Sequence, residues 1–165
     1  MDNARETLDH LMQHHGSRLL RLCTLNLRDA SLAQDAVQDT FLKAFKHFDQ
    51  FRGDAEALTW LTAIAMNVCR DYRRAAWVRH VDRRVEADAL PRTADFAFPD
   101  NTVIRAVTAL PPRYREVILL RYYQNMKQKE VAAALGVSER AVRQRLKKAN
   151  YMLRNELKEW YEDEG

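Results

Sequence analysis

A segment near the C-terminal end of the sequence carries the residue types best suited to reading DNA. In the major groove, arginine pairs with guanine, glutamine pairs with adenine, and lysine meets phosphate oxygens. Such side chains occur here at helical spacing, so they share one face of a single helix. The sequence therefore predicts a DNA contact made by Arg140, Arg143, Gln144 and Lys147, with Ser138 at the start of their helix.

The residues around this face follow the order that a helix-turn-helix requires. Val131 and Leu135 point a first helix, expected over residues 128–135, toward a core. Gly136 can adopt the left-handed conformation that ends this helix, and Ser138 is a good N-cap for the next. We therefore predict a helix-turn-helix, although a helical hairpin with a solvated basic face is the alternative. On the second helix, expected from 138 to about 161, the core positions are Val142, Leu146, Ala149 and Leu153.

An expected helix over residues 31–48 has two different faces. Its apolar stripe, which includes Phe41, Phe45 and Phe48, is predicted to lie in the core. The opposite stripe combines carboxylates, an amide and an exposed leucine, a mixture suited to docking on a basic helical partner. An ordinary solvated face is the alternative. The candidate contact residues are Asp35, Gln38, Asp39 and Leu42.

The next expected helix, over residues 54–76, places a tryptophan on the same face as hydrogen-bond donors and cations. An aromatic ring beside cations can stack on unpaired bases while the cations hold phosphates. The alternative is that this tryptophan packs under another helix. The candidate nucleic-acid face consists of Trp60, Asn67, Arg70, Asp71 and Arg74.

Composition narrows the fold class. Of the 165 residues, 47% are apolar and 30% are charged, which is typical of a globular protein and not of a fibre or a membrane span. All four prolines fall between residues 91 and 112, so both flanks can be helical. We predict an all-α fold with two small helical domains, residues 1–77 and 102–165, joined by a flexible linker over 78–101. The apolar spacing predicts four helices in the first domain, residues 4–15, 17–27, 31–48 and 54–76, and four in the second, residues 102–110, 113–123, 128–135 and 138 to about 161.

The positive charge is gathered in two places. The formal net charge is +4. Residues 70–84 hold six arginines against two aspartates, and residues 139–148 hold five cations against one glutamate, whereas residues 85–101 are acidic. Such an uneven distribution indicates a polyanionic partner.

Neither a metal site nor a catalytic residue is predicted. Cys23 and Cys69 lie in apolar runs without CxxC spacing, as expected of small buried residues in a reducing compartment. His10, His14 and His15 raise the alternative of a metal sensor or a metal-dependent hydrolase, but they lack acidic partners at ligand spacing. No secretory or membrane-spanning segment is recognisable, so we expect a cytoplasmic protein without a cofactor and without membrane insertion.

In their order and spacing these segments resemble the extracytoplasmic-function sigma factors of bacteria, over nearly the whole chain. Residues 35–45 are similar to the family's region that clamps the coiled coil of the RNA polymerase beta-prime subunit. Residues 51–53, 59–61 and 71–74 are similar to its promoter-melting and minus-ten segments. Residues 110–122 look like the start of its second domain, and the helix-turn-helix looks like its minus-thirty-five reader.

The resemblance implies a sigma factor and not an enzyme. Its expected partners are core RNA polymerase, through the beta-prime and beta subunits, promoter DNA, and an anti-sigma factor. Asn67 would lie near a base flipped out of the minus-ten strand. Where the family often has Thr, Lys and Ser, this chain has Ala141, Arg143 and Gln144, so the promoter sequence does not carry over. A stand-alone helix-turn-helix regulator is the alternative, but it leaves residues 31–48 unexplained.

Overall fold

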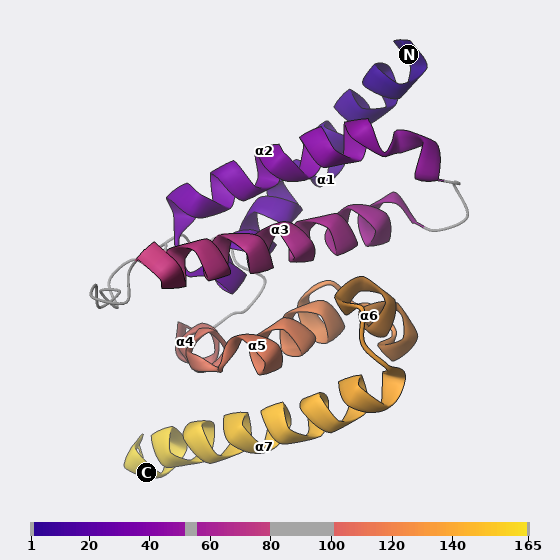
Figure 1. Cartoon of the computed structure of the whole chain (residues 1–165). Helices are drawn as coiled ribbons and strands as arrows, with labels where there is room; N and C mark the ends of the chain where they lie inside the picture. Colours follow the sequence, from indigo (N-terminus) through magenta and orange to yellow (C-terminus); the bar gives the residue numbers. More distant parts are fainter. Residues whose placement is uncertain (1, 52–55, 80–100, 165) are drawn as a thin grey trace. The chain divides into compact units, whose positions relative to one another are not determined.

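The computed structural model describes residues 2–51, 56–79 and 101–164. These residues form helices and no strand, which confirms the predicted all-α class (Figure 1). The chain divides into two compact units, Met1–Arg92 and Thr93–Gly165. Most of the predicted linker lies outside the described residues, while its two ends belong to the flanking helices α3 and α4.

Three long helices build the first unit. They are α1 (Asp2–Leu27), α2 (Ala30–Lys46) and α3 (Ala57–Arg79), and the short 3-10 turn η1 (Phe48–Gln50) follows α2. Each of the three packs on the other two. The fully buried side chains that join them include Leu19, Leu22, Leu25, Leu61, Ala65 and Met66.

The helix α1 is continuous, so the prediction of two helices, residues 4–15 and 17–27, is wrong. The break was expected at Gly16, yet a glycine inside a helix costs only about 1 kcal/mol. The apolar periodicity continues across it: Leu8 and Leu19 are eleven residues apart, close to three helical turns, and both are buried. Burial along one continuous face therefore outweighs the glycine.

A tight turn joins α1 to α2. Arg28 ends α1 with a positive φ of 59°, in the left-handed region. Asp29 then caps α2, because its carboxylate accepts a hydrogen bond of 3.0 Å from the backbone N–H of Leu32. This turn sets the start of the helix that carries the acidic candidate residues.

The two cysteines are buried side by side in the first unit, as the sequence predicted for each. Cys23 on α1 and Cys69 on α3 are both free and fully buried. The hydrogen bond with Cys69 and burial raise the pKa of the Cys23 thiol well above its usual value. Both residues therefore act as small core residues that join α1 to α3.

The second unit consists of shorter helices packed against one long helix. These are α4 (Asn101–Ala109), α5 (Pro112–Ile118), the π-helical turn η3 (Leu119–Tyr123) and α6 (Gln128–Leu135). The long helix α7 (Glu139–Glu164) packs on α4, α5 and α6 and runs past all three (Figure 1). The single helix predicted over residues 113–123 is thus an α-helix that widens into a π turn.

A buried arginine at the start of α5, Arg115, bonds to the end of α4. Arg115 is 5% exposed, and its guanidinium donates to the carbonyls of Thr108, at 2.9 Å, and Leu110, at 3.3 Å. It therefore satisfies carbonyls that the end of α4 leaves without helical partners.

Among the helices that the structure describes, none is both long and apolar enough to cross a membrane.

Candidate functional site

The turn between α6 and α7 has the geometry predicted for a helix-turn-helix. Gly136 has a φ of 68°, and the carbonyl of Ala132 accepts from the backbone N–H groups of Gly136 and Val137. The Ser138 hydroxyl then accepts a hydrogen bond of 3.1 Å from the backbone N–H of Ala141. The first helix thus ends on a left-handed glycine and the second begins on a capping serine.

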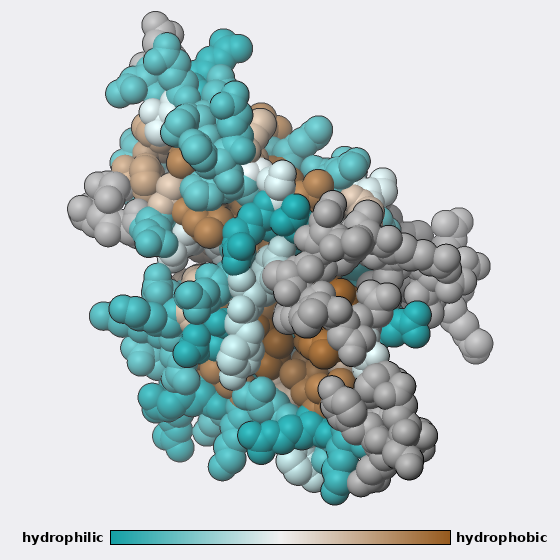
Figure 2. Space-filling model, turned by 180° about the vertical axis from the view of Figure 1, so that it is seen from behind, coloured by the Kyte–Doolittle hydropathy of each residue, from teal (hydrophilic) through white to brown (hydrophobic). Residues whose placement is uncertain are grey.

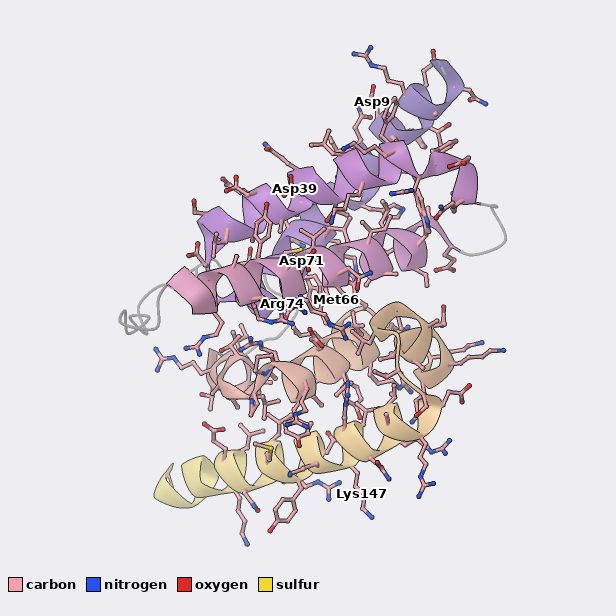
Figure 3. All side chains as sticks on the ribbon, in the orientation of Figure 1. Asp9, Asp39, Met66, Asp71, Arg74 and Lys147 are labelled. Carbon is pink, nitrogen blue, oxygen red and sulfur yellow. The ribbon has the colours of Figure 1, made fainter. Side chains whose placement is uncertain are left out.

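The start of α7 separates a buried face from an exposed polar face. Val142 and Ala149 are fully buried and Leu146 is 6% exposed, which fixes the rotation of the helix. The hydrophilic surface over α6 and the first half of α7 is visible in Figure 2. Lys147 points away from α4, α5 and α6 (Figure 3). The exposed side chains on this face are those predicted to contact DNA: Arg140, Arg143, Gln144 and Lys147.

These four side chains are available to a partner. Within the residues that the structure describes, none of them takes part in an internal hydrogen bond or ion pair. Ser138 differs, because its oxygen already caps α7. Its predicted contact with DNA therefore comes second to a structural role, whereas the four exposed side chains have no structural role that competes.

The candidate face on α2 is exposed, and it carries one more apolar side chain than the sequence predicted. Asp35, Gln38 and Leu42 are exposed, with Leu42 at 59%. Phe45 was predicted to lie in the core, but the structure contradicts this, because its side chain is 46% exposed. At 100° per residue Phe45 falls on the stripe of Gln38 and Leu42, since seven residues make almost two turns. The core stripe of α2 consists instead of Ala33, Ala36, Thr40, Phe41 and Ala44.

The fourth candidate on α2, Asp39, is half-buried and bonded to α3. Its carboxylate accepts a hydrogen bond from the Tyr72 hydroxyl. One turn further along α2, the Lys43 ammonium lies 3.8 Å from the Asp71 carboxylate. Asp39 and Asp71 thus face the space between α2 and α3 (Figure 3). The apolar spacing of residues 54–76 predicts only that Tyr72 faces inward, and no signal in the local sequence pairs it with Asp39.

The third candidate face lies on α3. Asn67, Asp71 and Arg74 are exposed and share one stripe, and Arg70 flanks them half-buried. Trp60 was predicted to stand exposed beside them, but it is half-buried. Its ring stacks on Phe51 at 4.8 Å between centroids. It also meets the ring of a third aromatic residue, Phe48, edge-on at 6.5 Å.

The histidines of α1 do not gather a metal-binding set. The rings of His10 and His14 are in edge-to-face contact, with centroids 4.3 Å apart. The described residues contain no group of three or more His, Cys, Asp or Glu side chains that could hold a metal ion. Burial and the nearby charges of His14 and Arg18 lower the pKa of His15.

The fold and these faces define a two-unit helical DNA-binding protein whose second unit carries the helix-turn-helix. Residues 11–79 match the family Sigma-70 region 2, and residues 100–150 match the family Sigma-70, region 4. The ECF RNA polymerase sigma factor SigM of Mycobacterium tuberculosis is 34% identical over 152 residues, covering 90% of this chain and 76% of SigM. The chain belongs to the ECF sigma factors of the sigma-70 family, which direct RNA polymerase to specific promoters.

One further relative is much longer. The chain is 33% identical over 140 residues to the probable RNA polymerase sigma factor RfaY of Xanthomonas campestris pv. campestris. That match covers 79% of this chain but only 35% of RfaY, so the chain spans about a third of its length.

Two solved structures have a similar fold. The sigma factor RpoE of Bartonella quintana, crystallised with the anti-sigma factor NepR, has a TM-score of 0.80 at 20% identity and covers 93% of this chain and 98% of RpoE. CnrH, in complex with the cytosolic domain of CnrY, has a TM-score of 0.67 at 29% identity and covers 93% of this chain and 89% of CnrH. The match to region 2 accounts for α2, which a stand-alone regulator left unexplained.

Proposed function

We propose that the three faces divide promoter recognition among them. In this proposal the domains are residues 1–77 and 102–165, with the linker between. The face of α2 binds core polymerase, the face of α3 captures the minus-ten element, and the start of α7 reads the minus-thirty-five element. The observation that carries this proposal is the exposed, unpaired polar face of α7 opposite a fully buried apolar face.

The polymerase contact consists of Asp35, Gln38, Asp39 and Leu42, extended by Phe45. Acidic and apolar side chains together suit a partner helix of the beta-prime subunit that offers basic and apolar residues. Leu42 and Phe45 can add to the binding free energy, because burial contributes roughly 25 cal/mol for each Å² of apolar surface removed from water. At 59% and 46% exposure, Leu42 and Phe45 still have surface to bury.

The minus-ten contact consists of Asn67, Arg70, Asp71 and Arg74. Trp60, whose ring stacks on Phe51, borders this site. Capturing an unpaired base must offset an unstacking cost of a few kcal/mol. An amide can pair with a base edge, while the cations hold phosphates. Since Trp60 is already stacked on Phe51, a base would meet only the part of its ring that remains exposed.

The minus-thirty-five contact consists of Arg140, Arg143, Gln144 and Lys147, with Ser138 at the N-terminus of α7. Arginine and glutamine offer paired hydrogen bonds to base edges, and lysine offers a phosphate contact. The positive end of the α7 dipole also favours a phosphate near Ser138. This face therefore has groups for both sequence recognition and general affinity.

A regulatory partner belongs to the same proposal. CnrH is similar to this chain and was solved with a cytosolic domain, and RpoE with an anti-sigma factor. We expect an anti-sigma factor to occupy the exposed faces of this chain and so keep it from polymerase. The chain itself performs no covalent chemistry in this proposal, because polymerase supplies the catalysis, and it acts in the cytoplasm, where polymerase and chromosome meet.

The proposal is tested by run-off transcription with core polymerase on a promoter library. Wild-type protein should give specific initiation that core polymerase alone does not give. Gln38→Ala should reduce initiation by weakening assembly, while Gln13→Ala, an exposed glutamine on α1, serves as the matched control. Absence of any specific initiation by the wild type would refute the proposed function.

A further inference from the structure

Two polar cross-links join α2 to α3 between the proposed polymerase and minus-ten faces. The Tyr72 hydroxyl donates to the Asp39 carboxylate, and the Lys43 ammonium lies 3.8 Å from the Asp71 carboxylate. Asp39 and Lys43 are one helical turn apart on α2, while Asp71 and Tyr72 are consecutive on α3. The two cross-links therefore connect one turn of each helix.

The Tyr72 link is the stronger of the two. The side chains of Lys43 and Asp71 are 47% and 61% exposed, and an ion pair so open to water contributes little. Asp39 is half-buried, so its carboxylate needs a hydrogen-bond donor to offset the water it has lost. Burial, the hydrogen bond to Asp39 and the nearby carboxylate charges raise the pKa of Tyr72. The hydroxyl therefore keeps its proton and remains a permanent donor.

We propose that Tyr72 is a positioning residue for polymerase binding. Its hydroxyl holds the Asp39 carboxylate in the orientation that a basic group of core polymerase contacts. A carboxylate has about four lone-pair sites, so the bond from Tyr72 leaves room for a bidentate arginine. This inference rests on the proposed role of Asp39 in the polymerase contact.

The expected benefit is preorganisation. A carboxylate that is already fixed loses little rotamer freedom on binding, whereas a free one must be ordered at that moment. Tyr72→Phe keeps the ring and its packing and removes only the donor. We expect it to weaken the affinity for core polymerase by about two- to tenfold, the range that ordering one side chain typically costs.

The test is a double-mutant cycle on the full-length protein. Affinity for core polymerase is measured by competition with labelled wild type for Tyr72→Phe, Asp39→Ala and the double variant. Tyr151→Phe, which removes the hydroxyl of a 66% exposed tyrosine, is the matched control and should bind like the wild type. If Tyr72 acts through Asp39, the double variant binds no more weakly than Asp39→Ala alone.

Three outcomes would overturn the inference, and they are distinguishable. Additive losses in the double variant would mean that Tyr72 acts on the fold and not through Asp39. Unchanged affinity in Tyr72→Phe, alongside a loss in Asp39→Ala, would refute the positioning role and leave the proposed polymerase contact intact. Unchanged affinity in Asp39→Ala would remove Asp39 from the polymerase contact, and the positioning role with it.

Discussion

Arg143→Ala and Lys147→Ala should weaken promoter binding in two different ways. Both side chains are exposed on α7 and neither has an internal partner among the described residues, so their removal leaves no buried group unpaired. If Arg143 reads a base, Arg143→Ala should cost about 1 to 3 kcal/mol of binding free energy, and only on promoters that carry the matching base. If Lys147 contacts a phosphate, Lys147→Ala should weaken binding equally on every promoter sequence. It should also lower the slope of log affinity against log salt concentration by about 1.

The assay is a salt titration of holoenzyme binding to matched and mismatched promoter duplexes. Thermal unfolding provides the control, because surface substitutions without partners change stability by less than about 0.5 kcal/mol. Both variants should therefore unfold like the wild type. Equal losses for Arg143→Ala on matched and mismatched promoters would show that this arginine contacts the backbone, and an unchanged salt slope for Lys147→Ala would remove its phosphate contact.

Three further predictions concern stability. Gly136→Ala should destabilise the second unit by about 1 to 2 kcal/mol. The positive φ alone sets this cost, because no atom lies within 4 Å of the added Cβ. Gly136→Asn should cost less, and equal losses of the two variants in thermal unfolding would contradict this. Asp29→Ala should cost about 1 kcal/mol in urea unfolding, and Asp29→Ser should recover most of it, since serine also caps; no loss in Asp29→Ala would mean the cap is dispensable. The lowered pKa of His15 means that the native state binds fewer protons than the unfolded chain. Stability should therefore fall as the pH drops below about 6.5, and His15→Gln should flatten this trend; an unchanged trend would assign it to other groups.

The helix-turn-helix could be predicted from sequence because its determinants are local. Gly136 and Ser138 act on backbone groups within a few residues of themselves, and the core positions of α7 repeat at helical spacing. The face of α7 that packs on α4, α5 and α6 is the one that this apolar spacing marks. The four exposed side chains therefore lie where the periodicity predicted.

The faces of the first unit were harder to predict because packing between helices decides them. Phe45 is apolar and belongs to the predicted core stripe, yet small side chains such as Ala36 and Ala44 fill the α2 interface. Gly16 looked like a helix end, but burial on both sides of it keeps α1 intact. The ring of Trp60 stacks on Phe51, which lies nine residues earlier and outside the helix, so helical periodicity cannot predict this contact.

The two units therefore differ in how function is tied to stability. On α7 the apolar residues that fix its rotation are buried, whereas Arg140, Arg143, Gln144 and Lys147 are exposed, so a change of promoter preference at these four positions need not cost stability. On α2 and α3 the half-buried Asp39 is bound to Tyr72, which means that its replacement alters both the contact face and the packing of two helices. Substitutions should thus be tolerated more readily on the exposed face of α7 than at Asp39, even though both positions belong to proposed binding surfaces.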